Sequence, residues 1–338
     1  MNRDKLVELG QKVLELIEAN DCILIFGHKD ADGDTLGCSL AFEEALRARG
    51  KSVSVVIPPP LPQQYGWLPG FDRITDRPRD GIEPGLVLFF DAANLERSGS
   101  AADSIPDRAT IVNVDHHPSN DRFGDVNIID PDAAAVAEMV VAILESWKWE
   151  ITPEMATNLY TALVTDTGGF RHENTDADAL ETAARLARYG VEPSFVTTMV
   201  YKSRPLTTLR LNALCMAAMQ VEFDGRLAWT KVTRRMLQDA GAVMAETEDL
   251  IDTLNTIADL DMAIVFKEVR DNQTKISVRS RGRVDAARFC SQFGGGGHSR
   301  AAGAEVDASM HEAIDLVLAA ARQAIAGNSD AVGSPQPQ

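Results

Sequence analysis

The sequence predicts an α/β protein: a mostly parallel sheet with helices on both faces, joined by a helical linker to a smaller α+β domain. Short apolar runs alternate with helical patterns through the first part of the chain, which is typical of a parallel sheet. Farther along, paired β-rich runs flank Asp-Gly and Asp-Asn turns, which indicates hairpins. The chain has 338 residues, enough for two domains at about 150 residues each.

The first domain is predicted to cover residues 1–200 and to hold the parallel sheet. Each predicted strand is a short apolar run, as expected for a strand that is buried on both faces. The predicted strands are residues 22–26, 52–57, 86–90 and 110–114. Helical patterns follow an N-terminal amphipathic helix and predict helices at residues 35–49, 132–147, 152–164 and 175–189.

A polar break at Ser203-Arg204-Pro205 separates the two domains, because the residue before a proline disfavours helix. We expect a helical linker at residues 201–220, with its helix at 206–219, and the second domain at 221–326. A tail at 327–338, rich in Gly, Ser and Pro, is predicted to be disordered. The expected hairpins pair residues 220–223 with 226–232 and residues 262–269 with 275–279, and the expected helices are 246–258, 284–293 and 310–325.

Charge and hydropathy restrict the class of protein. Fifty acidic residues against 33 basic ones give a formal net charge of −17, which argues against an extended basic track for long nucleic acid. No run approaches the roughly 18 to 20 apolar residues of a membrane helix, and the N-terminus lacks a signal pattern. The four cysteines show no paired zinc-type spacing and no disulfide framework. We therefore expect a cytoplasmic protein with no membrane contact.

Residues that suit metal binding gather where the predicted strands end. In parallel sheets the carboxyl ends of the strands form the edge at which ligands bind. Taken alone, the cluster of His28, Asp32 and Asp34 is explained equally well by an acidic turn in which Asp34 caps the next helix. A helix that ends at glycine likewise explains the glycines after Asp166. The clustered residues are His28, Asp32, Asp34, Asp91, Asp115, His116, His117 and Asp166.

Together these side chains predict a two-metal hydrolytic site. Six of them supply nitrogen and oxygen ligands without a thiolate, enough for two divalent cations that share one carboxylate. Two cations about 3.5 to 4 Å apart lower the pKa of a bridging water and hold the attacking and leaving oxygens of a phosphoryl transfer. Imidazole and carboxylate ligands favour Mn²⁺, with Mg²⁺, Co²⁺ and Zn²⁺ as alternatives. The six predicted ligands are His28, Asp32, Asp34, Asp91, His116 and Asp166.

The motif order resembles the DHH phosphoesterase superfamily, specifically its nanoRNase and pAp phosphatase branch. The motifs that carry the resemblance are His28-x-x-x-Asp32-x-Asp34, Asp91, Asp115-His116-His117, Asp166 and Gly294-Gly295-Gly296-Gly297-His298. Two departures stand out: Ala31 occupies a position where the family commonly has proline, and residues 131–138 are alanine-rich where relatives often have Ser or Thr.

The resemblance implies roles for individual residues. One metal would take His28, Asp32 and Asp91, and the other would take Asp34, Asp91, His116 and Asp166, with Asp91 bridging. His117 would contact the scissile phosphate, and Asp115 would accept a hydrogen bond from an imidazole and fix its tautomer. The family also tends toward dimers, so we expect a homodimer.

A basic segment in the second domain is predicted to bind substrate. Between residues 272 and 303, six basic residues stand against the single acid Asp285, and the glycines before His298 allow a backbone phosphate nest. The alternative is a flexible hinge with solvated arginines. Arg97 either touches a phosphate or pairs with Glu96 or Asp103. The predicted substrate-binding residues are Arg279, Arg281, Gly295, Gly296, Gly297, His298 and Arg300.

These expectations lead to one predicted function. The resemblance implies a manganese-dependent phosphoesterase that degrades short oligoribonucleotides to mononucleotides and dephosphorylates 3′-phosphoadenosine 5′-phosphate (pAp). A cyclic dinucleotide phosphodiesterase and a RecJ-like single-strand exonuclease are alternatives, and an inorganic pyrophosphatase fits less well because it lacks the glycine-histidine loop. A non-catalytic nucleotide sensor is the last alternative, since it would need an incomplete metal site.

Overall fold

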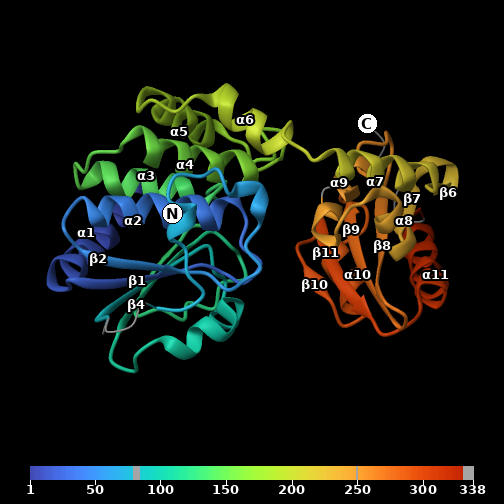
Figure 1. Cartoon of the computed structure of the whole chain (residues 1–338), viewed down its shortest axis with the longest axis horizontal. Coiled ribbons are helices and arrows are strands. Elements are labelled where there is room, and N and C mark those ends of the chain that lie inside the picture. The colour runs from blue at the N-terminus through green and yellow to red at the C-terminus, as the bar shows by residue number, and fades with distance from the viewer. Residues whose placement is uncertain (79–83, 249, 330–338) are drawn as a thin grey trace, which may run out of the picture. The chain divides into compact units, whose positions relative to one another are not determined.

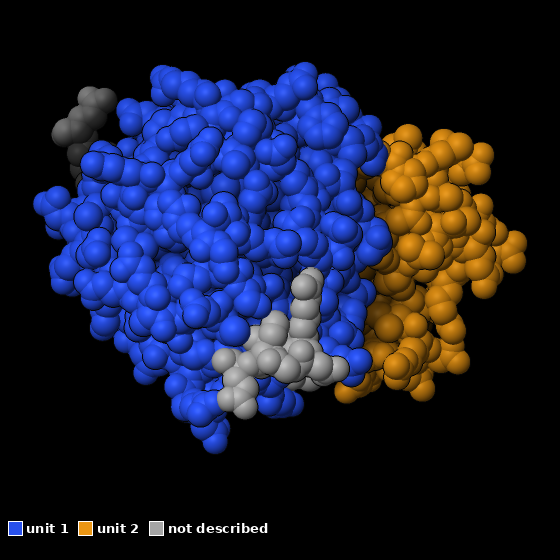
Figure 2. Space-filling view, turned by 60° about the vertical axis from the view of Figure 1, so that its left-hand side comes forward, with its two compact units in different colours: residues 1–203 blue, residues 204–338 orange. Residues whose placement is uncertain are grey.

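The computed structural model describes residues 1–78, 84–248 and 250–329 (Figure 1). The described chain forms two compact units, Met1–Ser203 and Arg204–Gln338, which Figure 2 shows in different colours. Each unit contains its own sheet and its own apolar core. The two units are therefore described separately.

Unit 1 is built on a five-stranded sheet in the order β2-β1-β3-β4-β5, and every neighbouring pair is parallel. This arrangement confirms the predicted parallel α/β fold. The fifth strand was not expected, because its four residues are too few to show a periodic pattern. The strands are β1 (Cys22–Phe26), β2 (Ser52–Val56), β3 (Leu86–Phe90), β4 (Thr110–Asp115) and β5 (Val126–Ile129).

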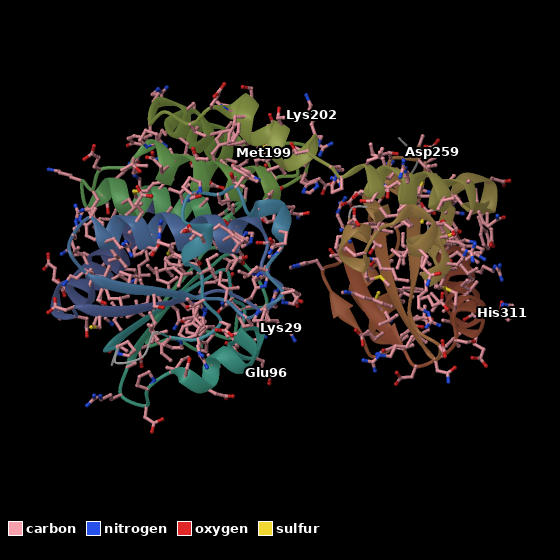
Figure 3. All side chains as sticks on the ribbon, in the orientation of Figure 1. Lys29, Glu96, Met199, Lys202, Asp259 and His311 are labelled. Carbon is pink, nitrogen blue, oxygen red and sulfur yellow. The ribbon has the colours of Figure 1, made fainter. Side chains whose placement is uncertain are left out.

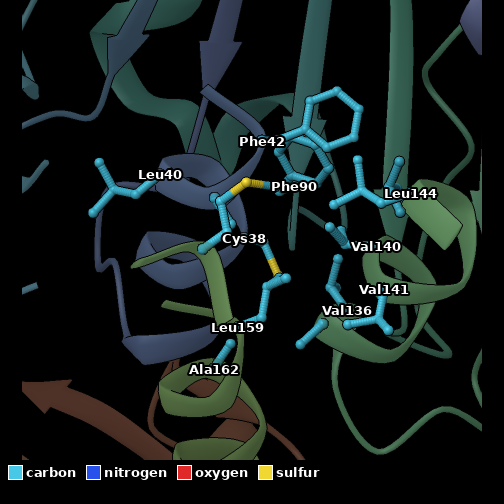
Figure 4. Packing of buried hydrophobic residues seen from close by; sticks show 14 of the residues in the cluster. Cys38, Leu40, Phe42, Phe90, Val136, Val140, Val141, Leu144, Leu159 and Ala162 are labelled. Atoms are coloured by element: carbon cyan, nitrogen blue, oxygen red, sulfur yellow. The ribbon is translucent and has the colours of Figure 1, made fainter. Parts of the chain in front are cut away.

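Two layers of α-helices cover one face of this sheet (Figure 1). Helices α1 (Arg3–Ala19), α2 (Gly33–Arg47) and α3 (Val136–Ser146) pack against the strands. Helices α4 (Pro153–Asp166), α5 (Ala177–Arg188) and α6 (Pro193–Tyr201) form the outer layer, and α6 was not expected. Figure 4 shows apolar side chains of α2, α3 and α4 meeting Phe90 in the core between them.

The other face of the sheet is covered by a 3₁₀ segment, η3 (Leu95–Ser104), and by loops. Alternate residues of β1 and β3, such as Phe26 and Phe89, point to this side and stack with ring centroids 5.3 Å apart. Leu95 and Ile105 pack against them. The α-helices thus cover one face of the sheet, and 3₁₀ structure and loops cover the other.

The strand order places a topological switch point at the carboxyl edge of the sheet. From β1 the chain crosses to β2 on one side, and β3 then pairs with β1 on the other side. The connections therefore diverge at the carboxyl ends of β1 and β3, the position at which doubly wound sheets bind ligands. The loops after these two strands begin with Gly27 and Asp91.

Unit 2 is a six-stranded sheet in the order β10-β11-β9-β8-β7-β6 with helices on both faces. Both predicted hairpins are present, β6 (Gln220–Glu222) with β7 (Leu227–Val232) and β8 (Met262–Arg270) with β9 (Gln273–Ser280). Helices on one face are α7 (Leu206–Ala217), α8 (Arg234–Ala240) and α9 (Leu250–Leu254). On the other face lie α10 (Ala286–Ser291) and α11 (Met310–Ser329).

Several details of unit 2 differ from the prediction. The helix expected at the linker, α7, packs on the sheet of unit 2. In place of the helix expected at 246–258 there are a 3₁₀ turn, η5 (Met244–Thr247), and the short helix α9, and Glu246 of η5 accepts hydrogen bonds from Thr207 and Thr208 of α7. Helix α8 and strands β10 (Gly296–Gly297) and β11 (Ala301–Val306) were not expected, since these short segments lack a clear apolar period.

Helix α11 includes the first three residues of the predicted tail at 327–338, and residues 330–338 lie outside the described residues. None of the helices in the described ranges combines the length and apolar character needed to cross a membrane. All four cysteines are free thiols.

Candidate metal centre

The loop after β1 presents His28, Asp32 and Asp34 at the carboxyl edge of the sheet. Asp32 Oδ1 accepts the backbone N–H groups of Asp34 and Thr35, each at 3.0 Å, so it caps helix α2. The helix begins at Gly33, so the interpretation in which Asp34 caps a helix from residue 35 is wrong. Asp34 lies in the first turn, where its side chain turns inward and is fully buried.

The Asp34 carboxylate is held by the backbone of another segment. Its Oδ2 accepts the N–H of Val136 at 2.6 Å, and its Oδ1 accepts the N–H of Ala137 at 3.2 Å. Both donors belong to the first turn of α3, where helix N–H groups lack partners within the helix. Burial, with the charges of Asp166 and Asp91 nearby, raises the pKa of Asp34 well above its ordinary value. The alanine-rich segment thus contributes main-chain donors.

Asp91 occupies the centre of the cluster, directly after β3. Its backbone has φ of +60°, an uncommon conformation for a residue with a side chain. The Oδ2 atom accepts the Thr35 hydroxyl at 2.7 Å and lies 3.4 Å from His28 Nε2. Burial would raise the pKa of Asp91, but the hydrogen bond with His28 and three histidine charges outweigh burial and hold it below its usual range.

His116 and Asp166 form a close pair beside Asp91. His116 Nε2 lies 3.2 Å from Asp166 Oδ2 and 3.8 Å from Asp91 Oδ1. The Nδ1 atom faces the carbonyl oxygen of Ala133 at 3.0 Å, which fixes the ring with Nε2 toward the carboxylates. Burial lowers the pKa of His116, yet the hydrogen bond with Asp166 and the surrounding acids raise it to about 11. Burial raises the pKa of Asp166 to about 6 against the opposing effect of His116.

His28 lies next to Asp91 Oδ2, whereas His116 lies next to Asp91 Oδ1. Burial lowers the pKa of His28, but the hydrogen bond with Asp91 and the charge of Asp32 raise it overall, while the charge of Arg97 opposes the increase. The Arg97 backbone is joined to this loop, because its carbonyl oxygen accepts the N–H of Lys29 at 2.7 Å. Within the described part of the chain, Arg97 forms no pair with Glu96 or Asp103, so that interpretation of Arg97 is wrong.

His117 is oriented by a buried carboxylate. Asp115 Oδ1 lies 2.7 Å from His117 Nδ1, and Asp115 Oδ2 accepts the Asn120 amide at 2.6 Å. Asp115 is fully buried, so these two donors satisfy both of its oxygens. His117 Nδ1 also lies 3.5 Å from Asp91 Oδ1. The histidine that Asp115 contacts is thus His117.

These side chains form three groups whose ligand atoms lie within 4.8 Å of one another. Asp91 belongs to two groups and His116 to two, so the groups are contiguous. Asp91 Oδ1 is buried without a hydrogen-bond partner among the described atoms, although two imidazoles face it. A cation satisfies such an oxygen, so the residues present fit metal binding. The groups are His28–Asp32–Asp91, Asp34–His116–Asp166 and Asp91–His116–His117.

The structure places all six predicted ligands in this one cluster, although they come from four separate segments. Sequence reasoning missed two residues that position them, Thr35 and Asn120. The signal for Thr35 was its place in the first turn of a helix that follows the acidic loop. Asn120 carried no usable signal, because asparagine in a turn is common.

In unit 2, the predicted basic segment covers β9, α10, β10, the start of β11 and the loops between them. Arg279 Nε contacts Asp252 Oδ1 at 2.9 Å, and the Arg281 guanidinium donates to the carbonyl oxygen of Asn255. His298 and Arg300 are exposed at the turn between β10 and β11. Arg279 and Arg281 therefore both contact other residues of unit 2.

Two of the glycines in this segment have packing reasons. A Cβ at Gly295 would lie 2.1 Å from the carbonyl oxygen of Gly303, and one at Gly297 would lie 2.5 Å from that of Ala301. Gly296 differs, because its Cβ position is open and its φ is not positive. Backbone packing therefore accounts for glycine at 295 and 297 but not at 296.

The fold and the metal-binding cluster define the class of protein. A sequence profile of the DHH family N-terminal domain matches residues 22–163, and a DHHA1 domain profile matches residues 227–327. The chain belongs to the DHH family, as the motif order predicted.

Individual relatives are similar over nearly the whole chain. The bifunctional oligoribonuclease and PAP phosphatase NrnA of Thermus thermophilus is 35% identical over 94% of both chains. The protein of the same name from Bacillus subtilis is 26% identical over 87% of this chain and 92% of its own length. An exopolyphosphatase-related protein from Bacteroides fragilis has the same fold, with a TM-score of 0.88 over 97% of this chain and 98% of its own, at 23% identity.

Proposed function

We propose that this chain hydrolyses short oligoribonucleotides to mononucleotides and removes a phosphate from pAp, with two divalent cations, Mn²⁺ first among them. As a member of the DHH family, it is a hydrolase of phosphoester bonds. The names of its relatives support the choice of substrates. The observation that carries the proposal is the convergence of six N and O ligands around the partnerless oxygen of Asp91.

The proposed ligand sets follow the geometric groups. His28, Asp32 and Asp91 would hold one cation, and Asp34, His116 and Asp166 would hold the other together with Asp91. When bound, the two cations would neutralise phosphate charge and make water acidic enough to attack at neutral pH. Imidazole together with carboxylate is a ligand set that suits Mn²⁺, while Mg²⁺, Co²⁺ and Zn²⁺ remain alternatives.

The chain's own residues prepare this site for a phosphate. Thr35 and His28 fix the Asp91 carboxylate from one side, so that Oδ1 is presented toward His116 and His117. Asp115 accepts the Nδ1 proton of His117, so we assign His117 Nε2 to the scissile phosphate. Asn120 holds Asp115 in turn. The main-chain N–H groups of Val136 and Ala137 in α3 hold the Asp34 carboxylate in place, so no side-chain donor is needed for this.

We also propose that unit 2 binds part of the substrate. His298 and Arg300 are exposed at the β10–β11 turn, and Gly296 is exposed in β10 beside it. To bind a phosphate, Arg279 would have to break its contact with Asp252, and Arg281 its hydrogen bond to the Asn255 carbonyl oxygen. Otherwise the two arginines would support binding by holding the loop after β9 in place. We also propose short substrates, a homodimer and a cytoplasmic location, the first because a net charge of −17 disfavours long polyanions.

A substrate panel tests the proposal. The purified chain is stripped with a chelator, returned to Mn²⁺, and given pAp, a 5′-phosphorylated RNA dinucleotide, cyclic di-AMP and a long single strand. We expect turnover of pAp and the linear dinucleotide, none without metal, and loss of activity in Asp91→Asn. A marked preference for the long strand would indicate a RecJ-like exonuclease, and a preference for cyclic di-AMP would indicate a cyclic dinucleotide phosphodiesterase.

A further inference from the structure

Two cations lie on the segments that follow β1 and β3, at the rim of the metal-binding cluster. Lys29 directly follows His28, and Arg97 lies in the first turn of η3. The Lys29 backbone N–H donates to the Arg97 carbonyl oxygen at 2.7 Å, and the Arg97 N–H donates to Asn94 Oδ1 at 3.1 Å. Figure 3 shows Lys29 and Glu96, the neighbour of Arg97, along the same edge of unit 1. The two segments are therefore fixed to each other.

Neither cation is neutralised by the part of the protein that the structure describes. No hydrogen bond or ion pair of Lys29 Nζ or of the Arg97 guanidinium is formed with a described residue. The other two half-buried arginines in the described part of unit 1 are paired, Arg73 with Glu43 at 2.7 Å and Arg185 with Glu145 at 2.6 Å. In a chain with 50 acidic residues, a half-buried arginine without an acid partner among the described residues indicates a place for an external anion.

The position of Lys29 and Arg97 indicates which phosphate of the substrate they would bind. The segments that carry the two cations meet at the His28 side of the cluster, because Lys29 directly follows His28 in the chain and its N–H donates to the Arg97 carbonyl oxygen. His117, the residue assigned to the scissile phosphate, lies with Asp91 Oδ1 and His116 at the other side. A phosphate already held by His117 and by the metal charge has little need of Arg97, whereas a second phosphate of the same substrate would otherwise face only carboxylates.

We propose that Lys29 and Arg97 form a subsite for a second, non-reacting phosphate of the substrate. The guanidinium fork can take two oxygens of this phosphate, and the Lys29 ammonium adds a point charge. This inference rests on the proposed function and names a specificity that the metal ligands do not explain. Nucleotides with two phosphate groups should therefore be preferred to the same nucleotides with one.

The test compares pAp with adenosine 3′-monophosphate, which differs only in lacking the 5′-phosphate. The same comparison is made between a 5′-phosphorylated and an unphosphorylated RNA dinucleotide. We expect the parent chain to favour the member of each pair with the extra phosphate, and Arg97→Gln to reduce that preference by about 10- to 100-fold, mainly through KM. Lys29→Gln should reduce it less, and Arg97→Lys should keep part of it.

Matched controls separate a phosphate subsite from a general charge effect. Lys12→Gln on α1 and Arg188→Gln on α5 remove the same charge at exposed positions, and Glu96→Gln changes the neighbour of Arg97; all three should keep the preference. If Arg97→Gln slows both members of each pair in equal proportion, Arg97 is structural and the subsite is refuted. If the parent hydrolyses both members equally, the subsite is refuted while the proposed function stands, and hydrolysis of neither would refute the function itself.

Discussion

The hydroxyl of Thr35 determines how Asp91 presents its carboxylate. It donates to Oδ2 at 2.7 Å from a fully buried position, while Oδ1 stays without a hydrogen bond among the described residues. A carboxylate that bridges two cations needs such a fixed orientation, because its two oxygens must point in different directions. Asp91 also keeps an uncommon backbone conformation, which its surroundings must enforce.

Thr35→Val should therefore weaken metal binding without changing the fold. The substitution keeps the side-chain shape and removes the donor, and loss of such a supporting hydrogen bond costs about 10- to 100-fold in metal affinity or activity. Titration of the stripped protein with Mn²⁺ measures the affinity, and circular dichroism checks the fold. Thr35→Ser keeps the hydroxyl and should retain most of the affinity. Equal losses in both variants would contradict the role of the hydroxyl.

Glu138, in the first turn of α3, should make the free energy of unfolding depend on pH. Burial raises its pKa from 4.5 to about 7, although the Ala134 N–H at 2.7 Å lowers it in part. The folded chain thus binds this proton more tightly than the unfolded chain. The resulting stability is complete below about pH 4.5 and is lost as the pH rises through about 7.

Glu138→Gln stays neutral at every pH and keeps an oxygen for the Ala134 N–H. Its Tm should exceed that of the parent by a margin that grows from pH 5 to pH 8. Glu154→Gln, at an exposed position in the first turn of α4, provides the control and should show no such growth. A margin that is constant or shrinks with rising pH would show that Glu138 is ionised in the folded chain.

At the scale of elements, the approach of α2 to α4 brings the acidic loop to Asp166. The two helices meet at glycines of α2: a Cβ at Gly33 would lie 2.3 Å from Thr165 Oγ1, and one at Gly37 would lie 2.3 Å from the carbonyl oxygen of Asn158. Asp34 follows Gly33 in α2, and Asp166 follows Thr165 in α4. The glycines therefore set the distance between two predicted ligands.

Gly37→Ala should destabilise unit 1 by about 1–3 kcal/mol, because overpacking forces the α4 backbone to move. It should also weaken Mn²⁺ binding, since the movement separates Asp34 from Asp166. Gly10→Ala in α1 is the matched control: its Cβ would meet Ile143 at an ordinary 3.6 Å, so better helix propensity should stabilise the chain by about 0.5–1 kcal/mol. Denaturant unfolding of both variants measures the two values, and changes of the same sign would contradict the packing argument.

Elements with a repeated apolar pattern could be predicted from the sequence, and elements without one could not. Strands β1 and β3 are continuous apolar runs, and their predicted ends agree with the structure. Strand β5 is short, and β10 consists of two glycines, so neither has a period to detect. The clustering of the six ligands was predictable because each follows a strand or ends a helix. The role of Thr35 was not, since it acts on Asp91, 56 residues away in the chain, and that of Asn120 was not, since asparagine in a turn is common.

At the scale of the whole molecule, the two units have separate cores, and among the described residues the metal-binding cluster belongs to unit 1. The apolar clusters of unit 1 and unit 2 share no residue, and all three metal-binding groups lie between residues 28 and 166. Cations that bind the folded form stabilise it, by about 2.7 kcal/mol at a concentration 100 times the dissociation constant. This stabilisation should act on unit 1.

Calorimetry should accordingly show two unfolding transitions, of which Mn²⁺ raises one. The buried carboxylates of unit 1 repel one another without cations, so a chelator should lower that transition, while the other keeps its midpoint. Asp91→Asn removes the carboxylate shared between two groups and should abolish most of the Mn²⁺ shift. Lys267→Met, in β8 of unit 2, should move only the transition that Mn²⁺ leaves unchanged, which assigns the two transitions. Equal shifts of both transitions with Mn²⁺ would show that the units unfold together and that the cluster stabilises the chain as one body.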